Sequence, residues 1–262
     1  MPYSGEQQQW IRSHVNTDLI GREILTYDSV ESTNDLAKSL VTDWNREGTV
    51  ILADSQTRGR GRLGKSWHSE KDLGIYLSTM IMPELPPENM PQITMVAGVA
   101  VVQAINQFSQ ERAHLKWPND ILLNQKKVAG ILTENHQDHG HSGIIIGIGV
   151  NVNHSRFPIP LQHLATSLAM ENGQSFDRLP LIAALITQLD SEYRSFLDHG
   201  LPSTLHQWSQ NSEIFGLHLS LTQGDETHTG TAINLDERGR LVVLLDTGEE
   251  RAFDSGEVTL IS

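Results

Sequence analysis

The ten residues from Ile144 to Asn153 constrain the fold of this chain more than any other stretch. From Ile146 onward, branched apolar residues alternate first with two glycines and then with two asparagines. A period of two predicts a strand with one buried face. The glycines, Gly147 and Gly149, leave the opposite face without side chains, which indicates that a ligand or another backbone approaches closely there.

Helical periodicity occurs on both sides of this strand. Ser32 occupies an N-cap position with Asp35 three residues later, ahead of an apolar stripe that ends at Val41. Two more helices are predicted from their three- and four-residue apolar spacing, from about Ile93 to Phe108 and from Ile182 to Leu197. Short strands are expected between them at 115–117, 121–123 and 128–133, with a turn at 124–125. The pattern predicts an α/β (α+β) domain, a mixed sheet with helices.

The texture of the sequence changes after Trp208, where short alternating runs are separated by turn signals. These runs predict a small β-barrel of about 50 residues, a size at which docking on a larger domain adds stability. We therefore divide the chain into a larger domain, residues 1–211, and a barrel, residues 212–262. Residues 1–22 are interpreted as a short N-terminal extension, in which Trp10, Ile11 and Val15 are expected on one packing helix.

Composition and charge limit the classes of function. The chain is 38% hydrophobic and 19% charged, which is ordinary for a soluble globular protein. Its formal net charge of −13 argues against bulk binding of nucleic acid, because such binding needs many lysines and arginines. No apolar run reaches membrane-spanning length and the first ten residues lack signal-peptide features, so we expect a cytoplasmic protein without membrane contact. The absence of cysteine excludes disulfides and thiol catalysis.

A local exception to the acidic charge is GRGRLG at 59–64, which matches G-x-G-x-x-G and follows a predicted strand. A dinucleotide fingerprint requires a helix directly after the glycines, whereas this chain continues into a β-like run at 75–80. The dinucleotide-binding interpretation therefore fails. Four cations nevertheless fall within eight residues: Arg58, Arg60, Arg62 and Lys65. An anion is their expected target.

Further motifs accompany this loop in a regular order. They are Ser32-Thr33-Asn34, Gln56, GRGRLG with Trp67, Lys116-Trp117-Pro118-Asn119-Asp120, Lys127-Val128-Ala129-Gly130, and the glycine–asparagine strand at 147–153. From about Tyr27 to the C-terminus, the chain thereby resembles the biotin protein ligase family. The resemblance implies a catalytic domain followed by an SH3-like barrel. It also implies an ATP-dependent ligase that forms biotinyl-5′-AMP from biotin and ATP, with Mg²⁺ on the ATP, and then acylates a lysine of a biotin carboxyl carrier protein.

The resemblance also implies roles for individual residues. The biotin-binding set is Ser32, Thr33, Asn34, Gln56, Arg60, Gly61, Arg62 and Lys127. The set that binds ATP or the adenylate is Arg60, Trp67, Lys116, Asn119 and Asn153. Catalytic stabilisation of charge is assigned to Lys127, Arg62 and Lys116. The GRGRLG loop is expected to order over the ligand as a lid, whereas Trp117 is expected to be structural. Of Asn151 and Asn153, the second is the better match to the family.

Other interpretations remain open beside this one. A lipoate or octanoate ligase or transferase shares the fold class, although GRGRLG with KWPND favours biotin. A non-enzymatic nucleic-acid-binding arm built on RGRGR is disfavoured by the net charge. A polar segment with metal-ligating residue types is expected to be a solvated hairpin without a metal: Glu134, His136, Asp138, His139 and His141.

The chain also departs from parts of the family pattern. Only 26 residues precede Tyr27, too few for the winged helix-turn-helix of relatives that are also repressors, so we expect the ligase-only form and no contact with DNA. Leu63 stands where many relatives carry an arginine, which lowers the charge of the loop and leaves its order without ligand open. Ile261 stands where some relatives carry a basic residue, which leaves nucleotide contact by the barrel open. A homodimer through a sheet edge is left open as well.

Overall fold

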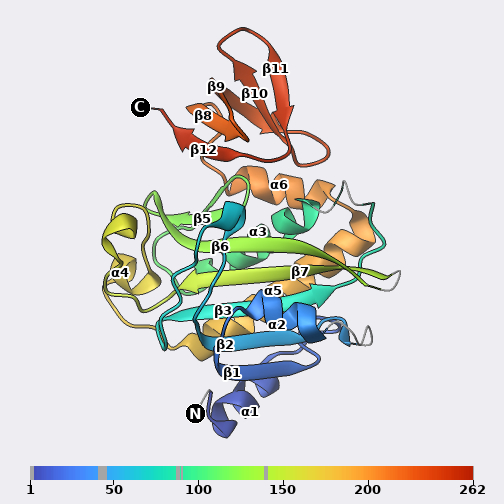
Figure 1. Ribbon diagram of the computed structural model, residues 1–262, viewed down its shortest axis with the longest axis vertical. Coiled ribbons are helices and arrows are strands. Elements are labelled where there is room, and N and C mark those ends of the chain that lie inside the picture. The colour runs from blue at the N-terminus through green and yellow to red at the C-terminus, as the bar shows by residue number, and fades with distance from the viewer. Residues whose placement is uncertain (1–2, 41–45, 87–88, 90, 139–140, 262) are drawn as a thin grey trace.

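The computed structural model describes residues 3–40, 46–86, 89, 91–138 and 141–261 (Figure 1). A seven-stranded sheet with the order β1-β2-β3-β7-β6-β5-β4 forms the centre of the larger domain. β1 and β2 are parallel and all other neighbours are antiparallel, so the sheet is mixed, as predicted. Its strands are β1 Ile24–Val30, β2 Val50–Gln56, β3 Gly74–Ile81, β4 His114–Lys116, β5 Asp120–Leu123, β6 Lys126–Asp138 and β7 His141–Asn151.

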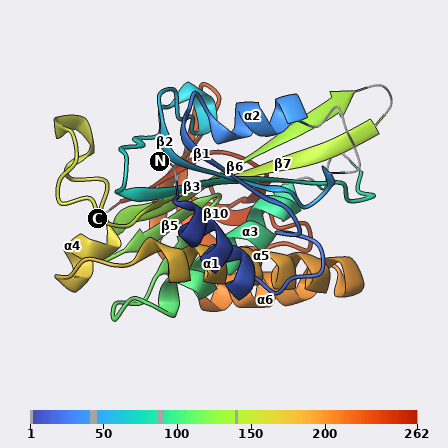
Figure 2. The ribbon, with the colours of Figure 1, turned by 90° about the horizontal axis from the view of Figure 1, so that it is seen from below.

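Helices cover the two faces of this sheet unequally (Figure 2). On one face lie α1 Gly5–His14, α3 Pro91–Asn106, α5 Arg178–His199 and α6 Pro202–Gln210. On the other lies α2 Thr33–Leu40, which contacts β3 and β7. The short helix α4 Leu168–Asn172 and the 3₁₀ turns Arg62–Gly64 and Ile159–Leu161 complete the larger domain. The less covered face leaves room for the site described below.

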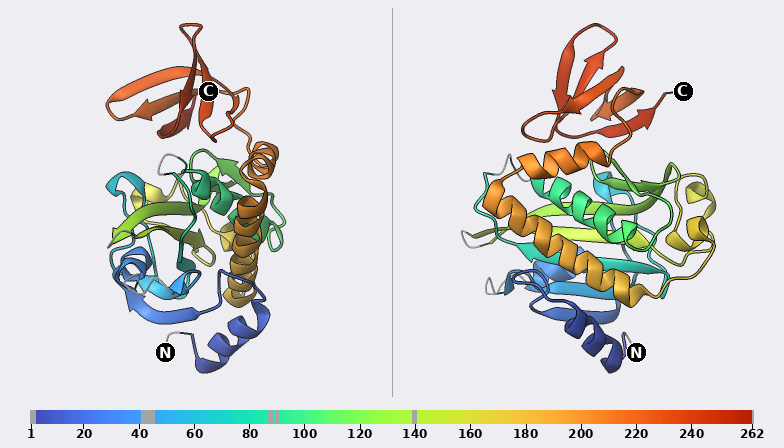
Figure 3. Two further views of the ribbon diagram at one scale, coloured as in Figure 1. Left: turned by 90° about the vertical axis from the view of Figure 1, so that its right-hand side faces the viewer. Right: turned by 180° about the vertical axis from the view of Figure 1, so that it is seen from behind.

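The long helices α3 and α5 lie side by side across the back of the sheet (Figure 3). α5 begins at an N-cap, where the Asp177 carboxylate accepts a hydrogen bond from the Leu179 N–H, and ends at Gly200 with φ of 72°. Its buried stripe includes Ile182 and Ile186, each of which contributes about 1.5–3 kcal/mol on burial. Both predicted long helices are confirmed, as is the N-terminal packing helix, α1. Val41, the predicted end of the α2 stripe, lies outside the described residues.

β7 is the predicted glycine-bearing strand, and it lies in the middle of the sheet between β3 and β6. The predicted turn at Asn124 and Gln125 joins β5 to β6, and both residues have positive φ, 46° and 64°. This geometry suits a tight two-residue hairpin. Lys127 is thereby placed one residue into β6, directly after the turn.

The C-terminal strands form a separate five-stranded antiparallel sheet with the order β11-β10-β9-β8-β12, the predicted small barrel. They are β8 His218–Gln223, β9 Glu226–Leu235, β10 Leu241–Leu245, β11 Glu250–Phe253 and β12 Glu257–Leu260. The barrel sits beyond β5 and α6 (Figure 1), and the buried Trp117 donates from Nε1 to the Gly239 carbonyl at 3.4 Å. Because α6 ends at Gln210 and β8 begins at His218, the division at 211 and 212 stays a prediction. Within the described residues, no helix is both long and apolar enough to cross a membrane.

Candidate functional site

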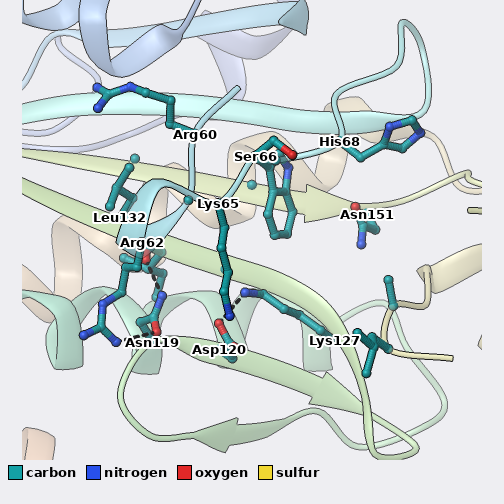
Figure 4. Close-up of a pocket in the computed structure, with 18 of the residues that line it drawn as sticks. Arg60, Arg62, Lys65, Ser66, His68, Asn119, Asp120, Lys127, Leu132 and Asn151 are labelled. Carbon is teal, nitrogen blue, oxygen red and sulfur yellow. Dashed lines mark hydrogen bonds and ion pairs between the residues drawn. The ribbon is translucent and has the colours of Figure 1, made fainter. Parts of the chain in front are cut away.

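A cavity of about 600 Å³ opens beside β6 and β7 (Figure 4). Its lining comes from the start of α2, the GRGRLG loop, the KWPND segment, the two strands, residues 157–165 and the barrel residues 256–258. All predicted site residues except Asn153 line this one cavity. Residues from stretches far apart in the sequence therefore meet at one place.

One end of the cavity presents buried hydroxyl and amide groups. The Gln56 Oε1 accepts from the Thr33 N–H at 2.8 Å and from the Thr33 hydroxyl at 3.1 Å. The Gln56 Nε2 donates to Ser69 Oγ at 2.9 Å, and Ser78 Oγ donates to Thr33 Oγ1 at 2.7 Å. Ser32 and Asn34 are buried beside them. Such a fixed set of donors and acceptors suits a small polar ring more than a flexible alkyl chain.

The alternating glycines of β7 explain how side chains reach this strand. A Cβ on Gly147 would lie 2.1 Å from Asn34 Oδ1, and a Cβ on Gly149 would lie 2.4 Å from the Trp67 ring. Asn34 and Trp67 therefore occupy the space that the two glycines leave. The Trp67 Nε1 is buried and has no hydrogen-bond partner among the described residues.

The GRGRLG loop crosses the cavity as a compact turn. The Gly61 N–H donates to the Lys65 carbonyl at 2.6 Å, and the Trp67 N–H donates to the Gly59 carbonyl at 2.9 Å. Leu63 sits at the tip with φ of 54°, a left-handed conformation that is costly for a leucine, and its side chain is 76% exposed. The tip is thus exposed and strained, whereas the base of the loop is hydrogen-bonded.

The other end of the cavity is rich in charge. Four cationic side chains line this end against two carboxylates: Arg62, Lys65, Lys116 and Lys127 against Asp120 and Glu257. Lys127 Nζ pairs with Asp120 Oδ1 at 2.5 Å and lies 5.4 Å from the centroid of the Trp67 ring. Lys65 Nζ pairs with Glu257 Oε1 at 2.6 Å, which joins the loop to the barrel. The surplus of positive charge favours an anion.

Burial and nearby charges shift the pKa values of two of these groups. Burial lowers the pKa of the Arg62 guanidinium, and the carboxylates of Asp120 and Glu257 act in the opposite direction. Arg62 donates to Asn119 Oδ1 at 3.1 Å, and Asn119 Nδ2 donates to the Ile131 carbonyl at 2.8 Å. The hydrogen bond from Lys65 is the main cause of the lowered pKa of Glu257, which remains ionised.

Two predicted residues lie differently from expectation. Asn153 is outside the cavity, because its side chain donates to the Phe176 carbonyl and accepts from the Phe176 N–H, each at 2.9 Å. Asn151 lines the cavity instead and donates to the Thr166 carbonyl at 3.0 Å. Arg60 contributes to the lining, but its guanidinium extends away from Arg62, Asn119 and Lys127 (Figure 4).

The predicted polar hairpin spans the end of β6 and the start of β7, which pair antiparallel, but Glu134 is not solvated as expected. This residue lies within β6, with a side chain 18% exposed, and it pairs with Lys38 and Arg60. His139 lies outside the described residues. Among the described residues, no group of three His, Cys, Asp or Glu side chains is placed to hold a metal ion.

Sequence reasoning missed one lining segment, residues 157–165, which contributes Phe157, Leu161, His163, Leu164 and Ala165. Its irregular apolar residues have neither helical nor strand periodicity, so no pattern pointed to it. The barrel contribution of Gly256 and Glu257 had a weak signal, since this stretch matches the terminal strand of the resembled family. The segment 157–165 lies beside Lys127, whose N–H donates to the Leu164 carbonyl. Gly256 and Glu257 lie at the charged end of the cavity.

Comparisons with known proteins agree with this geometry. Residues 26–151 match the model described as "Biotin/lipoate A/B protein ligase family", and residues 218–260 match "Biotin protein ligase C terminal domain". The "Bifunctional ligase/repressor BirA" of Bacillus subtilis is 36% identical over 242 residues, which cover 91% of this chain and 74% of that protein. The "Biotin--[acetyl-CoA-carboxylase] ligase" of Mycobacterium tuberculosis is 29% identical over 223 residues, 83% of this chain and 80% of that protein.

A solved structure extends the similarity to three dimensions. The biotin protein ligase from Aquifex aeolicus in complex with biotin and ATP has a TM-score of 0.80 and 30% sequence identity. The match covers 92% of this chain and 99% of that one, so it includes both the mixed sheet and the small barrel.

Proposed function

Because this chain belongs to the biotin protein ligase family, we propose that it activates biotin with ATP to biotinyl-5′-AMP and transfers the biotinyl group to a lysine of a biotin carboxyl carrier protein. The observation that carries the proposal is the single cavity in which a buried hydroxyl and amide end meets a cationic end. The substrates have the same arrangement: biotin has a neutral urea ring and a carboxylate tail, and the phosphates of ATP would lie beyond that tail.

In the first step, an oxygen of the biotin carboxylate attacks the α-phosphorus of ATP and pyrophosphate leaves. The biotin carboxylate is itself the nucleophile, so the reaction needs none from the protein. The protein would accelerate the step by positioning the reactants and by stabilising the charge that develops. Lys127 and Arg62 approach from β6 and from the loop, and they would stabilise the charge on the transferring phosphoryl group. Lys116 would contribute a third cation. Mg²⁺ would arrive with the triphosphate and neutralise part of its charge.

In the second step, the neutral amine of the acceptor lysine attacks the acyl carbon and AMP leaves. Lys127 would stabilise the departing phosphate, because its ammonium sits in a cavity that is partly closed to water. Thr33, Gln56 and Asn34 would hold the ring of biotin at the hydroxyl and amide end throughout both steps. Trp67 and Asn119 would contact the nucleotide side, with Asn151 in the place first assigned to Asn153.

A chain with a net charge of −13 is not suited to bulk nucleic-acid binding, so we expect the carrier protein, not DNA, as the macromolecular partner.

Mass spectrometry tests the proposal directly. The protein is incubated with ATP, Mg²⁺ and biotin, first alone and then with an apo biotin carboxyl carrier domain. We expect bound biotinyl-adenylate in the first reaction and one added biotinyl group on the carrier in the second. Lipoic acid or octanoate in place of biotin serves as the control, since modification of a lipoyl domain instead of the carrier would establish the alternative function.

A further inference from the structure

Glu134 accepts hydrogen bonds from donors that belong to two different walls of the cavity. Asn34 Nδ2 donates to its Oε2 at 2.7 Å, and Lys38 Nζ donates to its Oε1 at 2.7 Å. Both terminal nitrogens of Arg60 also donate to the carboxylate, at 2.8 Å and 3.0 Å. Glu134 lines a smaller neighbouring cavity and is not among the residues that line the large one, so it acts from behind the site.

Besides Glu134, one direct contact links the two walls, the ion pair of Arg60 with Asp35 of α2. Asn34 belongs to the hydroxyl and amide end, where its Oδ1 accepts from Ser78 Oγ at 2.6 Å. Arg60 belongs to the base of the GRGRLG loop, where it forms a backbone bridge with Ser66. Glu134 therefore connects the residue that reaches β7 at Gly147 with the loop that crosses the cavity.

The charges around Glu134 are balanced and favour its ionised form. Arg60 also donates to Asp35 Oδ1 at 2.6 Å, so two carboxylates share Arg60 and Lys38. Burial by itself would raise the pKa of Glu134, but the hydrogen bonds from Lys38, Asn34 and Arg60 hold it below its usual value. Burial would likewise lower the pKa of Arg60, and the hydrogen bond and charge of Glu134 hold it higher. The anchor is thus charged under neutral conditions.

We propose that Glu134 is a positioning residue that anchors the GRGRLG loop through Arg60 and Asn34, and so sets how long an acyl-adenylate stays in the cavity. The inference rests on the proposed function for the identity of that intermediate. The loop carries Gly61, Arg62 and Trp67 over the cavity, so its opening would expose the ligand to water. Arg60 is the second residue of the loop, so its anchor restrains the loop at its base, next to the Gly59 carbonyl that accepts from the Trp67 N–H.

Besides Glu134, the loop is held by Asp35, which shares Arg60, by the hydrogen bond from Arg62 to Asn119, and by two ion pairs. The Arg58 to Glu31 pair lies before the loop, and both of its side chains are mostly exposed, at 71% and 64%. The Lys65 to Glu257 pair is also exposed on both sides. Exposed pairs contribute little because water competes for both partners, whereas a carboxylate with four donors, mostly shielded from water, holds its partners more firmly.

The test compares Glu134→Gln with wild type and with Glu31→Gln as a matched control. Glutamine keeps the shape of residue 134 and an acceptor for Asn34, but it removes the charge that holds Arg60. Single-turnover adenylate synthesis and the off-rate of the intermediate are measured separately, and thermal unfolding checks that each variant is folded. For Glu134→Gln we expect an off-rate about tenfold faster, equivalent to about 1.4 kcal/mol, with synthesis changed less than about twofold. Glu134→Asp, which keeps the charge, should restore part of the retention.

A double-mutant cycle with Arg60→Gln separates anchoring from a general structural effect. If Glu134 acts through Arg60, the double variant should release the intermediate no faster than either single variant. An unchanged off-rate in Glu134→Gln, or additive effects in the cycle, would overturn the role of Glu134. Absence of adenylate in wild type and in Glu31→Gln would overturn the proposed function itself, and the inference with it.

Discussion

Replacement of Gly147 by alanine gives a direct test of how the buried end of the cavity is built. The added Cβ would lie 2.1 Å from Asn34 Oδ1 and 2.8 Å from its Cγ, far inside van der Waals contact. Asn34 would have to retreat by on the order of 1 Å to restore ordinary separations. It is held by Ser78, by Glu134 and, at 3.3 Å, by the Leu132 carbonyl, so the movement breaks hydrogen bonds that are part of the site.

The size of the effect follows from the cost of overpacking. Extra methyl groups in well-packed positions cost about 1–3 kcal/mol. If that cost falls on biotin binding, the dissociation constant for biotin should rise about fivefold to 150-fold, since 1.4 kcal/mol is tenfold. The proposed ATP contacts of Lys116 and Asn119 come from other segments, so the KM for ATP at saturating biotin should change little.

Calorimetric titration with biotin measures the first quantity, and pyrophosphate release at varied ATP measures the second. Gly5→Ala is the matched control, because an added Cβ at Gly5 meets nothing within 4 Å. A biotin affinity within twofold of wild type in a folded Gly147→Ala protein would refute the placement of the biotin ring against Asn34 and β7.

Three further predictions address other parts of the molecule. Lys127→Ala should reduce the rate of adenylate formation by at least about 100-fold, the usual cost of removing one donor that stabilises charge in a transition state. Pyrophosphate release near the wild-type rate would show that Lys127 is only a surface residue. Arg62→Gly should still form adenylate but release it faster, because it loses the donor to Asn119 and gains backbone freedom; lost synthesis with an unchanged off-rate would contradict the lid role. Burial, aided by the charge of His68, lowers the pKa of the fully buried His154 to about 4 from 6.5. The unfolded chain therefore takes up the proton first as the pH falls below 6.5, so urea unfolding should show a loss of about 3 kcal/mol between pH 7 and pH 4, and His154→Phe should show none of this contribution.

The parts of the fold that could be predicted are those with long, regular periodicity. The period of two in β7 and the period of 3.6 in α5 each continue long enough to predict the element. Asn124 and Gln125 are residue types that favour turns, and both have positive φ. Residues 157–165 have no period, and their position beside Lys127 depends on hydrogen bonds between backbones distant in sequence. Glu134 was misread for a related reason: nothing local shows that Asn34, Lys38 and Arg60 converge on it.

The exchange of Asn153 for Asn151 has a simple geometric cause. Alternation places residues 149, 151 and 153 on one face only while the chain remains extended, and β7 ends at Asn151. Beyond that point the Asn153 N–H donates to the Leu73 carbonyl, and its side chain turns to Phe176. Sequence spacing therefore gave the correct face but not the residue at which the strand stops.

The charge distribution explains how an acidic chain can keep a strongly cationic site. Lys127 and Lys65 are each paired with a carboxylate, Asp120 and Glu257, so these two cations are oriented before any ligand is present. An incoming phosphate would compete with those carboxylates for the same ammonium groups. It would also gain Arg62 and Lys116, neither of which forms an ion pair with a carboxylate among the described residues. Since the donors are already in place, binding requires little reorganisation, which is the condition under which fixed charges lower a reaction barrier most. The pairing also explains why the barrel belongs to the site: without Glu257, the end of the loop at Lys65 would lose its partner across the cavity.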